Sequence, residues 1–261
     1  MAERIVPIGT GALHDDQNSV FPRIAALGLD GLLVQFADTF SEPANRAVLA
    51  FRRALSDADF PGVLETAGSL ASVHVRFDPA VLPHSELTRE LSVMLAARDW
   101  YRAPLPAGRR LWRIPAAFGG EAGPQLARAA ALAGVSEAEA AEQLSTARLR
   151  ILATGFAPGQ PYLGILPGTW NLPRQTSLQT RVPPGGIALA VRQMVLFPAA
   201  SPTGWYHVAR TAFRCFRAEA ADPFPLKPGD EVMFPAVAVT EVGRLLADPA
   251  GEGGAEREDI R

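Results

Sequence analysis

The residues best suited to binding chemistry lie close together at positions 155–164. These ten positions include three glycines, two prolines and two aromatic residues. Proline and glycine together make a stiff loop whose backbone amides can face a ligand, and aromatic rings can form the wall of a pocket. Phe156, Pro158, Gly159 and Tyr162 are therefore candidate binding residues, although the same composition also suits a loop that only closes a sheet.

Arginines near predicted turns supply the charge that such a pocket would use. Arg174 follows a proline, Arg181 precedes the turn-forming run Val-Pro-Pro-Gly, and Arg210 stands in an apolar, strand-like stretch. A guanidinium can hold a carboxylate or a phosphate through two parallel hydrogen bonds. We therefore add Arg174 and Arg181 to the candidate substrate-binding residues. Arg210 and Gln193 are further candidates that depend on a resemblance to known proteins. Solvated surface arginines are the alternative interpretation.

No spacing of residues in the chain names a reaction. The sequence contains no P-loop, no G-x-S-x-G nucleophile motif, no H-E-x-x-H zinc motif and no pair of cysteines. The histidines are far apart, which favours solvated side chains over a ligand set or a general base: His14, His74, His84 and His207. Cys215 lies between aromatic residues and is expected to be buried and inert. We assign no catalytic residue and no metal site.

Composition excludes several classes of protein. The chain has 261 residues, 48% of them hydrophobic, which suffices for one large domain or two. Its 25 basic and 27 acidic residues leave a net charge of −2, so we expect no general attraction to nucleic acid or to an anionic membrane. The single cysteine excludes an internal disulfide, and neither a leader-like segment nor a run of about 18 apolar residues occurs. We expect a cytoplasmic protein.

The first part of the chain alternates strand and helix patterns. Residues 32–36 form an apolar run typical of a buried strand, and Ser41 can cap a following helix. Residues 72–77 alternate between apolar and polar side chains, as in a half-buried strand, and a second helical stripe covers residues 87–95. This order predicts a small α+β domain over residues 1–105, bounded by a cluster of proline and glycine.

The remainder of the chain changes character. Ser136 and Glu139 have the spacing of a capping box that starts a helix. From Leu149 onward, short apolar runs alternate with Pro/Gly turns, a pattern typical of a β-barrel or sandwich. We therefore predict a second, β-rich domain over residues 106–247. Residues 248–261 are rich in glycine and charge and are predicted to be disordered.

Several stretches also carry a family resemblance. They are Phe118-Gly-Gly-Glu-x-Gly-Pro124, Gly155-Phe-Ala-Pro-Gly-x-Pro-Tyr-Leu-Gly164, Pro173-Arg174, Arg181-Val-Pro-x-Gly185, Ser201-Pro-x-Gly-Trp205, Arg210-Thr211 and Pro228-Gly-Asp230. In this order they resemble the carboxyltransferase-domain family of allophanate hydrolase subunit 1. That family includes the sporulation-kinase inhibitor KipI and the B subunit of the bacterial ATP-dependent 5-oxoprolinase.

The resemblance implies a fold and a partner. It implies a small N-terminal α/β domain followed by a cyclophilin-like β-barrel. It also implies a homologous subunit 2, as a separate chain or a fused domain, with the ligand site between or near the two barrels. No cofactor is expected to bind this chain tightly. The complex would use ATP, and the missing P-loop favours an ATP site on a partner.

The chain departs from the family pattern at several positions. Gln160 stands where relatives often carry phenylalanine, and Gln175 and Gln179 stand where they carry arginine. A loop that is glycine-rich in the family has side chains at residues 191–198, so we expect a different loop shape. Leu144 aligns with a histidine that relatives often carry.

Three hypotheses for function follow. The first is a subunit of an ATP-dependent complex that hydrolyses a small amide such as 5-oxoproline or allophanate, acting with subunit 2 and inactive alone. The second is a catalytically inactive, KipI-like regulatory or scaffold protein that binds a partner such as a histidine kinase. Prolyl isomerase activity ranks last, because it rests on the analogy of the barrel alone.

Overall fold

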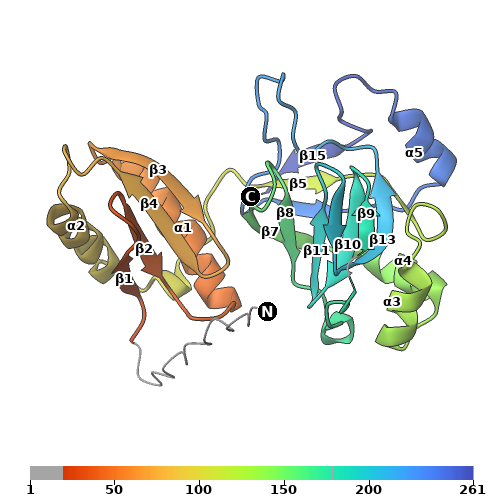
Figure 1. The fold of residues 1–261 in the computed structure, drawn as a ribbon, viewed down its shortest axis with the longest axis horizontal. Helices are drawn as coiled ribbons and strands as arrows, with labels where there is room; N and C mark the ends of the chain where they lie inside the picture. Colours follow the sequence, from red (N-terminus) through yellow and green to blue (C-terminus); the bar gives the residue numbers. More distant parts are fainter. Residues whose placement is uncertain (1–19, 178, 261) are drawn as a thin grey trace, which may run out of the picture.

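The computed structural model describes residues 20–177 and 179–260 of the chain, which fold as a mixture of helices and two large β-sheets (Figure 1). His14 and the expectation that the chain begins without a leader lie outside the described residues. Within the described residues, no helix has the length and hydropathy required to cross a bilayer.

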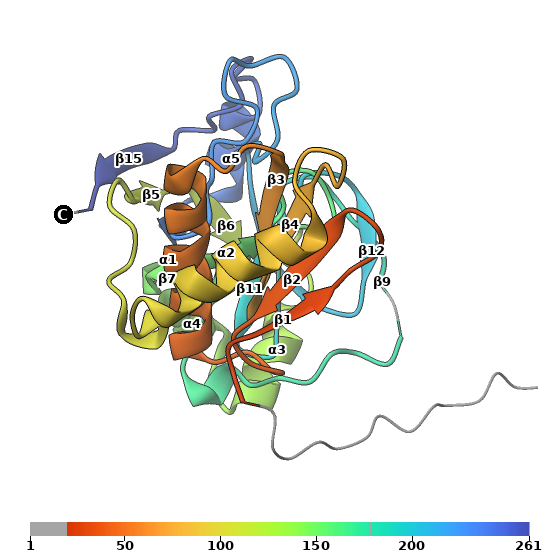
Figure 2. The same cartoon turned by 90° about the vertical axis from the view of Figure 1, so that its left-hand side faces the viewer.

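The first sheet contains four antiparallel strands in the order β1-β2-β4-β3. Helices α1 and α2 share a hydrophobic core with this sheet, and Figure 2 shows α2 crossing in front of α1. The short 3-10 helix η1 follows α2. The bounds are β1 Arg23–Ala26, β2 Gly31–Gln35, α1 Glu42–Ala58, β3 Val63–Gly68, β4 Ser72–Phe77, α2 His84–Ala96 and η1 Trp100–Arg102.

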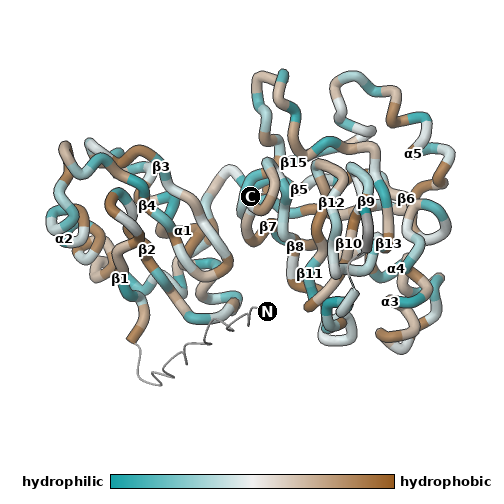
Figure 3. Tube along the Cα trace, in the orientation of Figure 1, coloured by the Kyte–Doolittle hydropathy of each residue, from teal (hydrophilic) through white to brown (hydrophobic). Residues whose placement is uncertain are grey.

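Local sequence explains these elements. The Ser41 hydroxyl accepts a hydrogen bond from the Ala44 N–H at 3.2 Å and so begins α1. Along β4, Val73 and Phe77 are fully buried, whereas the intervening His74 is half-buried. Hydrophobic segments also run through the strands of both sheets (Figure 3). The predicted strands and helices of this region are thereby confirmed.

The second sheet contains nine strands and curls into a half-barrel, in the order β15-β5-β14-β7-β8-β11-β10-β13-β6. Its strands are β5 Arg110–Arg113, β6 Ala116–Phe118, β7 Leu149–Thr154, β8 Pro161–Gly164, β10 Gly186–Ala190, β11 Gln193–Leu196, β13 Tyr206–Thr211, β14 Glu231–Met233 and β15 Glu256–Asp259. The remaining elements are α3 Leu126–Ala133, α4 Glu137–Thr146, η2 Gly168–Trp170, β9 Gln179–Val182, β12 Ser201–Thr203 and α5 Val239–Leu245. The capping box of Ser136 and Glu139 is present at the start of α4.

Each sheet encloses its own hydrophobic core. The first core lies between the four-stranded sheet and helices α1 and α2, with Phe51 at its centre. The second lies inside the curled sheet around Trp170 and Phe234. A polar contact joins the two parts: the buried Asn45 of α1 donates hydrogen bonds to the carbonyl oxygens of Leu70 and Leu152.

The prediction of disorder after residue 247 was wrong for the described residues 248–260. Strand β15 pairs with the edge of β5, from Glu256 opposite Arg113 to Asp259 opposite Arg110. Asp248 organises the preceding turn, because its carboxylate accepts backbone hydrogen bonds from Gly253 and its neighbours, and these bonds lower its pKa. Main-chain pairing with an open strand edge does not require apolar side chains, which explains why composition misled the prediction.

Candidate functional site

A groove of about 290 Å³ lies on the outer face of the curled sheet. Alternate residues of β10 and β11 face opposite sides, so Ile187 and Met194 enter the inner core while Ala188 and Val195 face outward. The β9–β12 pair contributes to the same outward cluster through Val182. The groove is lined chiefly by Phe156, Gln160, Tyr162, Arg174, Phe197 and Trp205.

Aromatic side chains form the walls of this groove. Tyr162 of β8 sits opposite Val195 of β11, and its ring meets the edge of Trp205 with the ring centroids 6.2 Å apart. Phe156 adopts a φ of 71° and is 77% exposed at the rim. A bulky residue in this left-handed region is strained, and such strain is concentrated at functional positions.

Gln160 brings an unusual polar group into the groove. The residue is only 2% exposed, and its Oε1 is buried without a hydrogen-bond partner among the described residues. Leaving a buried acceptor unbonded costs about 1–3 kcal/mol. Buried polar groups in folded proteins are nearly always bonded, so this amide is a candidate for contact with a ligand.

Arg174 supplies positive charge beside the same walls. Its guanidinium lies over the Trp205 ring, 5.5 Å from the ring centroid, and no described carboxylate forms an ion pair with it. Gln175 positions this segment: its Nε2 donates to the Trp205 carbonyl oxygen at 3.1 Å, and its amide pairs with that of Gln125. The groove therefore combines a stacked, unpaired cation with a desolvated amide and aromatic walls.

The candidate residues that were predicted from the sequence lie in different places in the structure. Phe156, Tyr162 and Arg174 meet in the groove. Pro158 and Gly159 line a separate cavity on the other side of the loop. Arg181 is exposed on β9, while Arg210 of β13 and Gln193 of β11 do not line the groove.

Gly159 has a structural reason to be glycine. Its φ is 71°, and a Cβ at this position would collide with the carbonyl oxygen of Cys215. The residue therefore allows the loop to pack closely on the segment that follows β13. Gly159 therefore has a packing role and does not line the groove.

Sequence reasoning missed several groove residues. A tryptophan such as Trp205 is more often a core residue, and Phe197, Thr203 and Gln175 carry no signal of their own. The signal for Gln160 is its polar character inside an otherwise apolar motif. Leu144, aligned with a family histidine, is fully buried in the inner core on α4 and lies outside the groove.

The turn between β10 and β11 keeps an unusual backbone. Val191 and Arg192 adopt φ angles of 45° and 62°, although neither is glycine. Such a two-residue hairpin turn normally favours glycine or asparagine. The chain thus accepts the left-handed conformation, with the Arg192 Nε donating to the Leu166 carbonyl oxygen at 2.8 Å.

Two titratable groups of interest lie beneath the surface. Cys215 is buried, as predicted, and burial raises its pKa to about 12, which disfavours the reactive thiolate. The expectation of solvated histidines is wrong for His207, which is 6% exposed. Burial, aided by the charge of Arg210, lowers the pKa of His207, against a hydrogen bond with the Ala209 backbone that raises it. Among the described residues, no group of three or more His, Cys, Asp or Glu is arranged to hold a metal ion.

Comparisons with known proteins agree with this architecture. Residues 22–226 match the family model described as the carboxyltransferase domain, subdomain C and D. The chain is 28% identical to the B subunit of 5-oxoprolinase from Bacillus subtilis (strain 168), over 81% of this chain and 91% of that protein. It is 32% identical to the B subunit of 5-oxoprolinase from Escherichia coli O157:H7, over 67% of this chain and 79% of that protein.

Solved structures show the same fold. The crystal structure of TTHA0988 superimposes with a TM-score of 0.68 at 29% identity; the match covers 80% of this chain but only 40% of TTHA0988. The Kluyveromyces lactis urea carboxylase, 17% identical, matches 88% of this chain and 23% of its own length with a TM-score of 0.66, which supports the fold alone. The chain belongs to the carboxyltransferase-domain family, subdomains C and D.

Proposed function

We propose that this chain is a subunit of an ATP-dependent complex that opens a small cyclic amide such as 5-oxoproline, together with a homologous second subunit. Three relatives that are 28–32% identical to it are named as the B subunit of 5-oxoprolinase. The observation that supports the proposal best is the groove itself. Among the described residues, the Gln160 Oε1 has no hydrogen-bond partner there and the Arg174 guanidinium has no ion pair, beside aromatic walls.

The chemistry of 5-oxoproline fits these groups. The ligand carries a carboxylate, which Arg174 can neutralise through two hydrogen bonds. It also carries a lactam, whose N–H and carbonyl oxygen lie on one edge and match the two ends of the Gln160 amide. Trp205 and Tyr162 would pack against the ring. A groove of this size lies at the small end of ligand pockets, as a ligand with few atoms requires.

The reaction adds water across the lactam C–N bond and yields glutamate, coupled to hydrolysis of ATP to ADP and phosphate. Negative charge develops on the carbonyl oxygen as the amide opens, so fixed donors and a nearby cation stabilise the transition state. Gln160, Tyr162 and Arg174 are the groups of this chain proposed for binding and orientation. No acid, base or nucleophile is assigned to it, and ATP is proposed to bind a partner.

We also propose which parts of this chain form domains and which part contacts the second subunit. Residues 1–105 and 106–247 are proposed as two domains, the second a cyclophilin-like barrel, because each part has its own hydrophobic core. The exposed, strained Phe156 at the groove rim is proposed to contact the second subunit. Aromatic residues presented in this way are common anchors of protein interfaces.

A second candidate is the KipI-like regulatory protein that binds another protein without catalysis. The composition of the groove favours it, because no aspartate, glutamate or histidine of the described residues lines this cavity. The two candidates differ in one measurable property, which is turnover by the assembled complex.

The test is to purify the chain with a homologous second subunit and to measure ATP-dependent formation of glutamate from 5-oxoproline. We expect Arg174→Ala to lower kcat/KM at least about tenfold, because a charge-assisted bond to the carboxylate is lost. Arg89→Ala on α2, which is mostly exposed and pairs with Glu90 at 2.8 Å, serves as the control and should change little. A well-folded complex without turnover would refute the enzymatic proposal and favour the regulatory one.

A further inference from the structure

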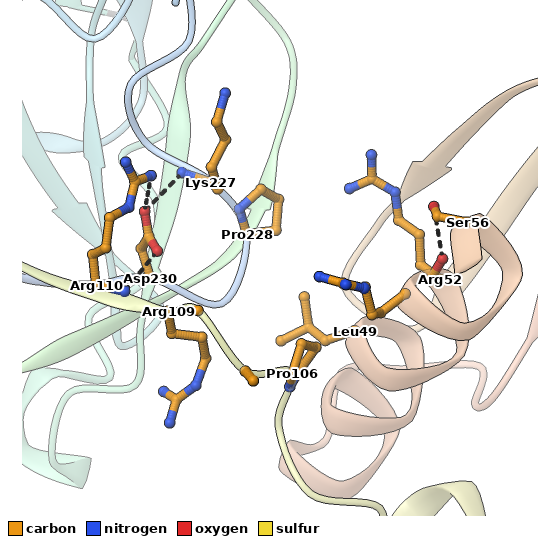
Figure 4. A pocket seen from close by; sticks show the side chains of 12 residues that line it. Leu49, Arg52, Ser56, Pro106, Arg109, Arg110, Lys227, Pro228 and Asp230 are labelled. Atoms are coloured by element: carbon orange, nitrogen blue, oxygen red, sulfur yellow. Dashed lines mark hydrogen bonds and ion pairs between the residues drawn. The ribbon is translucent and has the colours of Figure 1, made fainter. Parts of the chain in front are cut away.

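A second hollow lies away from the groove, between helix α1 and the turn that precedes β14. It consists of two cavities of about 450 and 510 Å³, which share Arg52, Lys227 and Pro228. Figure 4 shows the first of them, with α1 on one side and residues 227–230 on the other. Its walls are more than 170 positions apart in the sequence, so only the folded chain forms it.

Positive charge dominates the lining of the first cavity. Among the described residues, a single carboxylate lines it, that of Asp230, against five basic side chains: Arg52, Arg53, Arg109, Arg110 and Lys227. The Asp230 carboxylate is already occupied, because it pairs with Arg110 at 2.7 Å and accepts hydrogen bonds from the Trp112 indole and the Lys227 backbone. It therefore does little to neutralise the other cations.

Arg52 is the least compensated of these cations. Its Nε makes a long hydrogen bond of 3.4 Å to the Thr66 hydroxyl, and no described carboxylate forms an ion pair with it. Burial lowers the pKa of Arg52, and the charge of Glu65 opposes this effect. A largely desolvated guanidinium with so few partners gains much from an added anion.

The other cations have weak or shared partners. Lys227 pairs with Asp222 at 2.8 Å, but both side chains are about half exposed, and such surface pairs contribute little. The Glu231 carboxylate is shared by Arg109 and Arg148. Arg53 pairs with the exposed Asp57 on its own helix. Among the described residues, Glu65 is the carboxylate that lines the second cavity, and it pairs with Arg76 at 3.4 Å. After these pairs are counted, the first cavity retains excess positive charge.

The side chains are also placed to act together. In Figure 4 the heads of Arg52 and Lys227 project toward the same side of the cleft from its opposite walls. Both residues line the second cavity as well. An anion seated between them would contact both walls, and a doubly charged oxyanion matches two cations better than a single carboxylate does.

We propose that this cleft is a binding site for the phosphate group of a small ligand, held between Arg52 and Lys227. Bridging the two walls would stabilise the placement of α1 against the curled sheet. Pro158 and Gly159 line the second cavity while Phe156 lines the groove, so one stiff loop separates the two sites. The proposal concerns binding alone and does not depend on the proposed reaction.

The test is calorimetric titration of the full chain with inorganic phosphate, pyrophosphate and ATP at low and physiological salt. We expect saturable binding that weakens with salt, with Kd raised at least about tenfold by Arg52→Gln or by Lys227→Gln. Arg89→Gln removes the same charge from α2, outside the cleft, and should leave the Kd within about twofold. Thermal unfolding checks that each variant is folded. If Arg52→Gln does not fold, the Kd measured for Lys227→Gln tests the proposal.

The ligand series separates the sources of the phosphate. Similar affinity for all three ligands indicates recognition of the phosphate group alone, and tighter binding of ATP indicates a phosphorylated nucleotide; both support the site. Absence of binding by all three ligands overturns the proposal. So does binding that Arg89→Gln weakens as much as Arg52→Gln, since that result indicates only a general attraction to positive charge.

Discussion

At the scale of single residues, Gln160 is the most informative position of the chain. A buried amide oxygen without a partner is unfavourable for folding, and it is tolerated where a ligand completes the hydrogen bonds. The same side chain marks a departure from the apolar residue expected within its motif. Stability and ligand binding therefore place opposite demands on this residue.

Replacing Gln160 separates these demands. We expect Gln160→Met to leave stability unchanged or to raise it by about 1 kcal/mol, because a side chain of similar size removes the unbonded polar group. The same change should weaken 5-oxoproline binding about tenfold or more. Urea unfolding and calorimetry measure the two effects. The lactone analogue, which lacks the N–H, is the matched ligand control; equal weakening of lactam and lactone would argue against pairing with the lactam edge.

At the scale of elements, the most unexpected feature is β15. All four of its residues are exposed, yet they pair with β5 along the edge of the curled sheet. An ion pair of 2.9 Å between Arg113 and Glu258 crosses the two strands. The strand therefore covers an edge that would otherwise be open to pairing with another chain.

Removing β15 tests this role. We expect deletion of residues 256–261 to lower the free energy of unfolding by about 1–2 kcal/mol, since several backbone hydrogen bonds are lost. It should also promote self-association through the exposed edge of β5. Urea denaturation and size-exclusion chromatography measure these effects, with deletion of residue 261 alone as the control. If the longer deletion behaved like the control, β15 would have no stabilising role.

At the scale of the whole molecule, the question is how the two hydrophobic cores are held together. Asn45 is fully buried at their junction and bonds to carbonyl oxygens on both sides, at 3.1 Å to Leu70 and 3.0 Å to Leu152. Arg150 of β7 adds an ion pair of 2.9 Å with Glu42 at the start of α1. These contacts hold α1 against the curled sheet, and so they help to define the cleft in which the phosphate site is proposed.

Asn45→Ala should loosen this junction. We expect a loss of about 2 kcal/mol in unfolding free energy, because the replaced side chain leaves buried carbonyl oxygens unbonded. Proteolysis within residues 104–108, which connect the two parts, should become faster. The exposed Asn171 offers a matched control as Asn171→Ala. Unchanged protection of residues 104–108 would show that other contacts hold the two parts together.

Local patterns were sufficient to predict much of the secondary structure. The Ser41 cap, the alternation along β4 and the capping box of α4 depend on neighbours within a few positions, so the sequence alone determines them. The motif order likewise led to the family. Strand β15 was missed because its partner lies more than 140 positions away and its stability comes from the main chain.

The composition of the groove and of the phosphate cleft could not be predicted from the sequence, for a different reason. The sequence by itself identified Phe156, Tyr162 and Arg174 as chemically suitable side chains, because residue type alone carries that information. Which of them share a groove depends on strand register and on the overlying β9–β12 pair, and that arrangement left Arg181 and Arg210 outside it. The desolvation of Gln160 and the placement of Arg52 and Lys227 around one cavity are properties of packing between distant segments, so only the folded chain decided them.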